Sequence, residues 1–410
     1  MQPKTAKLEN VDIPIVTCVL ILLVTGLFTI YSATQNAPAM LGNVFSKQLS
    51  WMVVALLAVF AVNIFPIQLY RKYAYLAYAA IVLLLLLVLV IGKGSGATRW
   101  FYFGPIRVQP SEFAKLVALL ALARFLSDDR FDALNTVKGR VIAFSIVLLP
   151  MGLIVKQPDL GTSLVFPVLI LPVLFWAGLH WSTTILFFIP VVAALSSFNL
   201  ITFFIAMGCL TFIMVFSRKP LSVIIPNFII NILAGLLTPY IWLNKLHTYQ
   251  QNRILTFLGL EQDPRGLGYQ VLQSKVGIGS GGWLGKGWLE GTQTQLRFLP
   301  EQHTDFIFSV VGEEFGFLGV SVILLTFMVI IWRTLKIASE CKNRFASLVA
   351  TGSAVILLFH VIVNTGMTVG IMPVTGLPLP FLSYGGSALL SNMVMIGLIL
   401  NIGRRRLHYG

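Results

Sequence analysis

The sequence has few charged residues, since Asp, Glu, Lys and Arg make up 11% of 410 residues while hydrophobic residues make up 57%. A soluble domain carries about 25% charged residues, roughly twice this share. The chain also lacks the short alternating segments of a membrane β-barrel. Its apolar runs are instead long enough for helices that cross a bilayer, which needs about 20 residues. The composition therefore predicts an all-α polytopic membrane protein.

Cysteine is scarce as well. Cys18, Cys209 and Cys341 lie in or beside apolar runs, and no CxxC or HExxH pattern occurs. We therefore expect neither a disulfide framework nor a thiol or zincin metal site. A Mg²⁺ or Mn²⁺ ion held by carboxylates together with a pyrophosphate would leave no strong sequence pattern. The sequence therefore identifies no metal ligands, and it does not exclude a bound Mg²⁺ or Mn²⁺ ion.

No cleavage pattern follows the first apolar run, so we expect this run to stay as a membrane anchor. The sequence shows no soluble domain, internal repeat or low-complexity tail. We therefore predict one membrane domain over residues 1–410. Twelve apolar segments are expected to span the membrane, at residues 12–32, 47–65, 73–91, 110–126, 140–156, 161–178, 182–198, 200–217, 222–242, 312–333, 346–369 and 384–403.

The formal net charge of +14 indicates orientation rather than nucleic-acid binding, because Lys and Arg collect in cytoplasmic loops. With the N-terminus inside, about 17 cations fall in cytoplasmic segments, against about 6 in short outside segments and about 6 in one long loop. The cytoplasmic ones are Lys4, Lys7, Arg71, Lys72, Arg124, Arg130, Lys138, Arg140, Arg218, Lys219, Arg333, Lys336, Lys342, Arg344, Arg404, Arg405 and Arg406. Both termini are therefore predicted inside, and the loop at 243–305 outside.

That loop is the longest polar stretch, and it ends in the tract LPEQHTD (residues 299–305) directly before apolar sequence. A carboxylate beside a membrane segment is costly without a task, and partial burial can raise its pKa enough for general-base chemistry. Asp305 is thus a candidate base, and Glu301 with His303 makes its surroundings titratable. Two alternatives stay open: Thr304 or Asp305 caps the next helix, or His303 is the base.

Other polar residues cluster on the same predicted side. Glu112 and Lys115 are three residues apart at the start of a span, so they share a helix face; we expect them to face a cavity, although a plain ion pair is the alternative. Asp159 either caps the following helix or takes part in chemistry. The segment 374–387, VTGLPLPFLSYGGS, should interrupt helix geometry where it lines a cavity.

The glycine-rich run GIGSGGWLGKG at 277–287 fits neither phosphate-binding fingerprint, GxGxxG after a strand or GxxxxGK[ST]. Flexible backbone flanked by Lys275, Lys286 and Arg297 could still hold an anionic head group. The run also contains Trp283 and precedes Trp288, which are better explained as interfacial anchors than as sugar platforms.

Six ordered motifs resemble the SEDS family (shape, elongation, division and sporulation) of bacterial peptidoglycan polymerases, and in particular its elongation-type, RodA-like branch. They are residues 96–100 (GATRW), 109–115 (QPSEFAK), 157–163 (QPDLGTS), 273–287 (QSK with GIGSGGWLGKG), 299–314 (LPEQHTDFIFSVVGEE) and 378–390 (PLPFLSYGGSALL). The match covers nearly the whole chain. The family usually has ten spans, so residues 182–243 seem to add a helix pair of unknown purpose.

The resemblance implies a glycosyltransferase that joins lipid II units, with Asp305 as the essential catalytic residue. It also implies that Glu112, Lys115 and Asp159 line or support an extracytoplasmic cavity. The residues expected to bind substrate are Arg99, Trp100, Gln109, Glu112, Lys115, Gln157, Asp159, Lys275, Arg297, Glu301, His303 and Ser383. A class B penicillin-binding protein and other elongation-complex membrane proteins are the implied partners, in the bacterial inner membrane with the site facing the periplasm.

Three rival functions are kept: a lipid II flippase, whose polar residues would mark a transport path, a division-type, FtsW-like polymerase, and a scaffold for other wall-synthesis proteins. The flippase is less favoured because the polar residues gather at one side of the membrane and no inverted repeat is visible.

Overall fold

The computed structural model describes residues 11–35, 44–92, 99–104, 106–128, 134, 136–216, 221–244, 246, 248–258 and 266–405. Residues 96–98 of the GATRW motif lie outside the described residues, as do the cations Lys4, Lys7, Lys93, Arg130, Arg218, Lys219 and Arg406 that were counted for orientation.

All twelve predicted spans are helices. They are α1 (Ile13–Gln35), α2 (Val44–Ile64), α3 (Ile67–Ile91), α4 (Pro110–Ser127), α5 (Val137–Lys156), α6 (Leu160–Trp176), α7 (Trp181–Ser196), α8 (Leu200–Phe216), α9 (Leu221–Asn244), α13 (Ile307–Glu340), α14 (Arg344–Thr368) and α15 (Gly386–Arg405). The close pair α7 and α8 consists of two separate helices, as predicted.

Eight helices in the described part of the chain are long and apolar enough to cross a membrane: α1, α2, α3, α5, α9, α13, α14 and α15. Shorter apolar helices lie at Leu160–Trp176 and Leu200–Met214. The fold is therefore all-α and polytopic. The number of spans and their orientation stay predictions.

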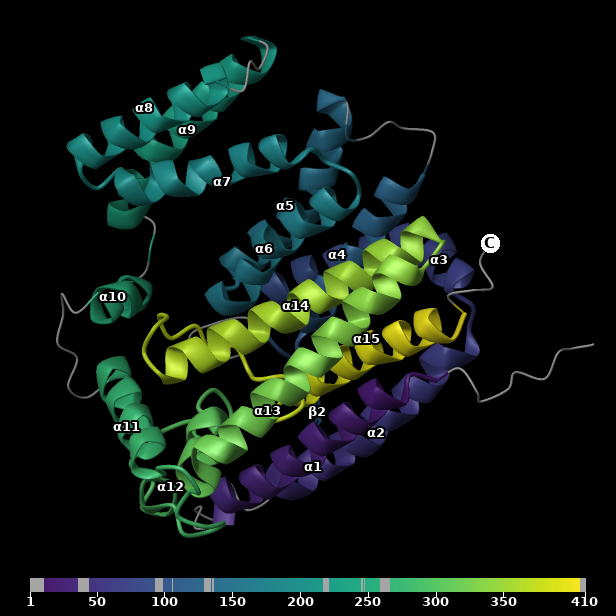
Figure 1. The fold of residues 1–410 in the computed structure, drawn as a ribbon, viewed down its shortest axis with the longest axis vertical. Helices are drawn as coiled ribbons and strands as arrows, with labels where there is room; N and C mark the ends of the chain where they lie inside the picture. The colour runs from purple at the N-terminus through teal and green to yellow at the C-terminus, as the bar shows by residue number, and fades with distance from the viewer. Residues whose placement is uncertain are drawn as a thin grey trace, which may run out of the picture. The chain divides into compact units, whose positions relative to one another are not determined.

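Helices α4, α14 and α15 form the interior of the larger of two compact units, which comprises Met1–Val173 and Gln262–Gly410. In α14 and α15, 78% of the apolar window is buried, against 17% in α2. Figure 1 shows α13, α14 and α15 side by side, and helix contacts place α1 against α13 and α2 against α15. Small residues allow this close packing: a Cβ atom on Gly352 would overlap Leu119 of α4.

The second compact unit, Leu174–Glu261, holds α7, α8, α9 and the short helix α10 (Thr248–Phe257). Its own small core contains Leu186, Met207, Leu210 and Met214. This unit covers residues 182–243, where the sequence predicted a helix pair beyond the family's usual ten spans; that this pair is additional stays a prediction.

The polar stretch at 243–305 is more helical than predicted. Besides α10 it contains α11 (Leu267–Ser280) and α12 (Thr292–Gln295). Gly277 and Gly279 lie inside α11, so the prediction of a flexible glycine cradle was wrong at these positions. Tertiary contact explains the glycine that follows: a Cβ atom on Gly281 would overlap the Gly312 carbonyl oxygen, so glycine here allows two backbones to approach each other.

A small hairpin before α4 was not predicted. Strand β1 (Phe101–Phe103) pairs antiparallel with β2 (Ile106–Val108), and Tyr102 lies opposite Arg107. The Arg107 guanidinium carbon lies 5.4 Å from the centre of the Tyr102 ring, a cation–π contact across the pair. Three of the four consecutive aromatic residues at 100–103 thus lie in a strand.

Candidate active site

Asp305 lies in a tight turn, residues 301–306, directly before α13. The helix begins at Ile307, five residues earlier than predicted, and its N-cap residue is Phe306. Neither Thr304 nor Asp305 therefore occupies the capping position that the sequence left open for them. The Asp305 side chain is partly exposed, whereas Phe306 is buried. An acid with water access next to a buried anchor is suited to chemistry.

The backbone of this turn is held by side chains from distant parts of the chain. The Asn364 amide of α14 donates to the Asp305 carbonyl at 2.9 Å and to the Leu377 carbonyl at 2.8 Å. The Ser383 hydroxyl donates to the Thr304 carbonyl at 2.6 Å. The Tyr384 backbone N–H donates to the His303 carbonyl at 2.9 Å. Three consecutive carbonyls are thus fixed, which restricts the position of the Asp305 side chain.

Residues 370–385, between α14 and α15, connect the predicted site residues to one another. A Cβ atom on Gly376, whose φ is +76°, would lie 3.4 Å from Asp305 Oδ2. One on Gly161 of α6 would lie 2.5 Å from the Thr375 carbonyl oxygen, and one on Gly370 would lie 2.5 Å from Lys275 Nζ. This non-helical segment therefore lies between the Asp305 turn, the start of α6 and helix α11. The prediction that it interrupts helix geometry is confirmed.

Asp159 caps α6, as one of the two predicted roles required. Its Oδ1 accepts from the Thr162 N–H at 3.3 Å, and its Oδ2 accepts from Gln109 Nε2 at 2.8 Å and from the Ser111 hydroxyl at 3.2 Å. The buried carboxylate thereby joins the starts of α4 and α6. Its predicted role in substrate binding stays a prediction.

Arg99 and Gln157 meet at the turn that precedes α6. The Arg99 guanidinium donates to the Gln157 carbonyl at 3.0 Å and to the Pro158 carbonyl. The Gln157 amide donates to the Leu85 carbonyl at 3.0 Å. These donors hold the 157–159 turn against α3, and Trp100 follows Arg99 with a partly exposed side chain.

Glu112 and Lys115 form the ion pair that the sequence left as the alternative, with Lys115 Nζ 3.0 Å from Glu112 Oε2; their position in a substrate cavity stays a prediction. Both are deeply buried, at 3% and 2% exposure, and Lys115 Nζ also lies 3.2 Å from Nε2 of His360, which is 0% exposed. His360 of α14 was not singled out from the sequence. A histidine within an otherwise apolar span is the signal that could have found it.

Strained backbone gathers around the Asp305 turn. Arg297, Glu301 and Phe381 all have φ values in the left-handed region, between 54° and 66°. Non-glycine residues adopt this conformation at a cost of about 1–3 kcal/mol, and such residues cluster at functional sites. A loop with only a structural role could use unstrained backbone. The strained residues therefore support a functional role for this turn.

The surroundings of His303 lower its pKa and so favour the neutral imidazole. Burial lowers the pKa of His303 below its ordinary value of 6.5, nearby Glu301 opposes this shift, and Arg297 adds to it. Burial also raises the pKa of Tyr384, whose ring centre lies 5.8 Å from that of His303. A neutral imidazole beside Asp305 can accept or donate a hydrogen bond without adding charge.

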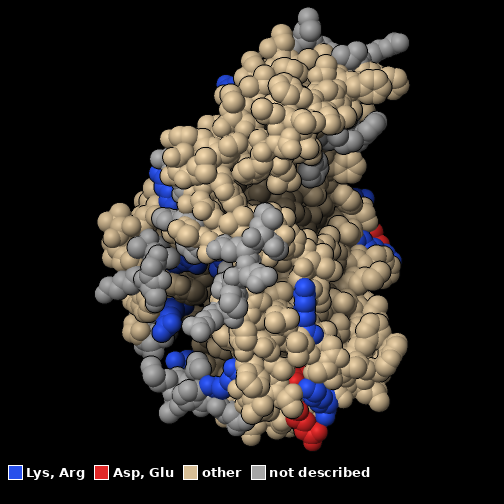
Figure 2. Space-filling view, turned by 90° about the vertical axis from the view of Figure 1, so that its left-hand side faces the viewer, with Lys and Arg blue, Asp and Glu red and all other residues tan. Residues whose placement is uncertain are grey.

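Cations surround the turn without ion-pair partners among the described residues. Lys275 is exposed on α11, and Arg297 is partly exposed between α12 and the turn. Figure 2 shows how sparse charge is on this face of the molecule, where most of the described surface is neither basic nor acidic. Two available cations near one carboxylate are therefore an unusual local feature.

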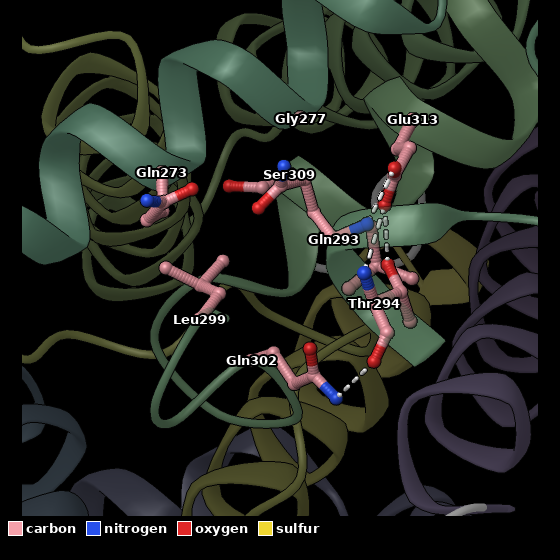
Figure 3. Close-up of a pocket in the computed structure, with 9 residues that line it drawn as sticks. Gln273, Gly277, Gln293, Thr294, Leu299, Gln302, Ser309 and Glu313 are labelled. Atoms are coloured by element: carbon pink, nitrogen blue, oxygen red, sulfur yellow. Dashed lines mark hydrogen bonds between the residues drawn. The ribbon is translucent and has the colours of Figure 1, made fainter. Parts of the chain in front are cut away.

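A small polar pocket lies beside the turn, lined by Gln273, Gly277, Gln293, Thr294, Leu299, Gln302, Ser309, Val310 and Glu313. The empty space among these residues is about 180 Å³ with open solvent included, and it leaves no room for even a water-sized group. Figure 3 shows Glu313 and Gln302 reaching Thr294 from different sides. The pocket is too small for a disaccharide and belongs to the supporting structure of the turn.

Metal ligands are not concentrated anywhere in the described part of the chain. No group of three His, Cys, Asp or Glu side chains is close enough there to hold an ion. A resident metal centre thus has no ligand set among these residues. An ion that arrives with a pyrophosphate would need only one or two carboxylates.

A family model described as "Cell cycle protein", for the FtsW, RodA and SpoVE proteins, matches residues 13–206 and 183–408. This chain belongs to that family, the SEDS family. The SEDS relatives include the peptidoglycan glycosyltransferase MrdB of Escherichia coli K12, 36% identical over 97% of this chain and 94% of that protein. The peptidoglycan glycosyltransferase RodA of Treponema pallidum is 33% identical over 93% and 95%.

Solved structures agree. One, described as "Structural coordination of polymerization and crosslinking by a peptidoglycan synthase complex", has a TM-score of 0.73 and 32% identity over 97% of this chain and 98% of that one. The rod shape determining protein RodA of Thermus thermophilus has a TM-score of 0.64 and 27% identity over the same shares. This SEDS protein is therefore a multi-pass membrane peptidoglycan glycosyltransferase of the elongation type.

Proposed function

We propose that this glycosyltransferase polymerises lipid II with Asp305 as its general base. The observation that carries the proposal is the Asp305 turn itself. Its backbone carbonyls are fixed by Asn364 and Ser383, while Asp305 as a whole residue stays partly exposed. A general base must be held within hydrogen-bond reach of the proton it removes, and this turn restricts the base without burying it.

The proposed step is a direct displacement. Asp305 takes the proton from the 4-hydroxyl of the acceptor GlcNAc, and the freed oxygen forms a bond to the anomeric carbon of the donor MurNAc. The bond from that carbon to the undecaprenyl pyrophosphate oxygen breaks, and the electron pair leaves with the pyrophosphate. Attack opposite the leaving group converts an α-linked donor into a β-linked glycan.

The leaving pyrophosphate requires positive charge. Lys275 and Arg297 are better suited to supply it than Lys115, because the Lys115 ammonium is buried against Glu112 and His360. Fixed cations in a site that excludes water stabilise developing negative charge by several kcal/mol. No step here needs a resident metal; a Mg²⁺ or Mn²⁺ accompanying the pyrophosphate is tested by adding chelator to the assay.

The setting follows from the same proposal. Lipid II carries its head group outside the cytoplasm, so the Asp305 turn would face the periplasm of a bacterial inner membrane. The relative whose structure concerns coordinated polymerization and crosslinking supports a class B penicillin-binding protein as partner, together with other elongation-complex membrane proteins. Cysteine labelling from outside sealed cells at Thr304 tests the orientation; labelling only after the membrane is opened would refute it.

The decisive experiment replaces Asp305 by Asn in the full chain and follows glycan chains formed from labelled lipid II. The amide cannot accept the proton, so polymerisation should fall by roughly 10² to 10⁴-fold while the protein stays folded. Glu290→Gln, an exposed neutralisation in the same region, is the control. Near-normal polymer from Asp305→Asn would refute the assignment, and transport of lipid II across vesicles without polymer would favour a flippase.

A further inference from the structure

Helix α13, which begins directly after the Asp305 turn, is broken at Gly316. This residue has φ 63° and ψ −162°, outside helical geometry. Residues 281–295, here called the 281–295 segment, enter the break. The Lys286 and Gly287 N–H groups donate to the Glu313 and Glu314 carbonyls at 3.0 and 3.1 Å. The break therefore satisfies its own free backbone groups with a neighbouring segment.

The return bonds complete the join. The Phe317 and Leu318 N–H groups beyond the break donate to the Gly282 and Trp283 carbonyls at 2.9 and 3.1 Å. A Cβ atom on Gly316 would overlap the 281–295 segment at Gly285. The two backbones thus meet without side chains between them, and the first part of α13 is held to the segment as one body.

Glu313 adds a second attachment. Its carboxylate is 1% exposed and accepts from five donors of the 281–295 segment. Oε1 accepts from Lys286 Nζ at 2.8 Å, from the Gln293 N–H at 2.8 Å and from the Thr292 hydroxyl at 3.2 Å. Oε2 accepts from the Thr294 N–H at 3.0 Å and from its hydroxyl at 2.8 Å. A buried carboxylate is tolerated only with such compensation.

The attachment continues to the Asp305 turn through Gln302. The Gln302 amide donates to the Thr294 carbonyl at 3.1 Å and to the Ala33 carbonyl of α1 at 2.8 Å. Gln302 is 4% exposed and lies three residues before Asp305. Figure 3 shows Thr294 bonded to Glu313 on one side and to Gln302 on the other. Thr294 is therefore the single residue that links Glu313 to Gln302 of the turn.

We infer that Glu313 is a positioning residue for Asp305, acting through Thr294 and Gln302. The inference rests on the proposed role of Asp305. Substrate contact is not required of Glu313, because its oxygens are occupied by donors of the 281–295 segment. A loosened segment lets the turn move, and a displacement of the base by about 1 Å can cost a factor of 10² in rate.

The experiment measures kcat and KM for labelled lipid II with the full chain carrying Glu313→Gln. The amide nitrogen faces groups that are themselves donors, so the attachment weakens. We expect kcat to fall by about 10 to 100-fold with KM changed less than about threefold, since only the base is displaced. Glu313→Asp keeps the charge and should recover part of kcat. A raised KM with unchanged kcat would assign Glu313 to binding and overturn the inference.

Thr294→Val keeps the test valid if Glu313→Gln does not fold. It removes one hydroxyl donor and leaves the backbone bond, so kcat should fall by about threefold to tenfold, the equivalent of one hydrogen bond. Glu290→Gln is the control and should match the parent chain. If Asp305→Asn is inactive while Thr294→Val and Glu313→Gln keep normal kcat, the inference alone fails. If Asp305→Asn stays active, the proposed function fails.

Discussion

Two acidic groups in this protein are treated differently by the fold. Glu112 is buried and shares Lys115 with the buried His360. Asp305 is partly exposed in a turn whose carbonyls, not its carboxylate, receive the amide of Asn364 and the hydroxyl of Ser383. Glu112 is enclosed together with its counter-ion, whereas Asp305 lies in a partly exposed turn that is held by its backbone.

This difference indicates how each group contributes. A carboxylate enclosed with its counter-ion mainly affects stability and helix packing, because removal of one partner leaves a charge without solvent. A carboxylate on a fixed backbone but open to water can exchange a proton with a substrate. The comparison can be tested by changing each group in the same way.

The largest expected effect is on rate, at Asp305. Asp305→Asn should lower polymerisation by roughly 10² to 10⁴-fold while the free energy of unfolding changes by less than about 1 kcal/mol. Glycan assay and denaturant unfolding in detergent, on the same sample, measure both quantities. If Asp305→Asn lowered the free energy of unfolding as much as Lys115→Met does, the distinction between Asp305 and Glu112 would fail.

The next effect is on stability, at the buried pair. Lys115→Met leaves Glu112 charged and unpaired in the interior, so the free energy of unfolding should drop by about 3–5 kcal/mol. The double variant Glu112→Gln with Lys115→Met should recover much of that loss, because no isolated charge remains. Unfolding curves of the two variants decide the matter, and equal stability of Lys115→Met and the parent would contradict it.

A smaller effect is expected at Gly376, whose φ is +76° and whose added Cβ would lie 3.4 Å from Asp305 Oδ2. An alanine in the left-handed region is strained by about 1–2 kcal/mol. Because residue 376 lies beside Asp305, relief of this strain should displace the base, and Gly376→Ala should lower the polymerisation rate by about tenfold. Gly104→Ala is the matched control: its φ is +61°, but its Cβ would meet nothing within 4 Å. Equal rates for the two variants would remove Gly376 from the site.

The smallest effect concerns pH. Burial lowers the pKa of His303 below 6.5 in the folded protein. As pH falls, the His303 imidazole therefore becomes protonated at a higher pH in the unfolded chain than in the folded protein. The contribution of His303 is therefore fully present above pH 6.5 and is lost as pH drops toward the folded pKa. Thermal unfolding in detergent from pH 7.5 to 5 should show a shallower decline for His303→Gln. An identical decline would show that His303 does not titrate in this way.

Much of the fold was predictable because long apolar runs must form helices in a membrane. All twelve predicted segments are helical, and the boundary at Asn199 separates α7 from α8 as expected. The hairpin at Phe101–Val108 and the helix over Gly277 were missed. Both depend on partners distant in sequence or on tertiary packing, which local propensity does not record.

The site was predicted in part. Asp305 and the Glu112–Lys115 pair were found because charge beside apolar sequence is costly. Asn364 could have been found by the same signal, since it is a buried amide within a predicted span. The role of Glu313 was left open, because no sequence pattern reveals that its five donors come from residues 286–294.

The sequence by itself determined the all-helical membrane fold and the SEDS membership, and it singled out Asp305 as the candidate base, because composition, ordered motifs and the cost of charge near lipid are local properties. Only the tertiary structure decided which polar groups hold the Asp305 turn and which are enclosed as ion pairs. Hydrogen bonds and burial depend on residues brought together by helix packing, such as Asn364 with Asp305 and Lys115 with His360.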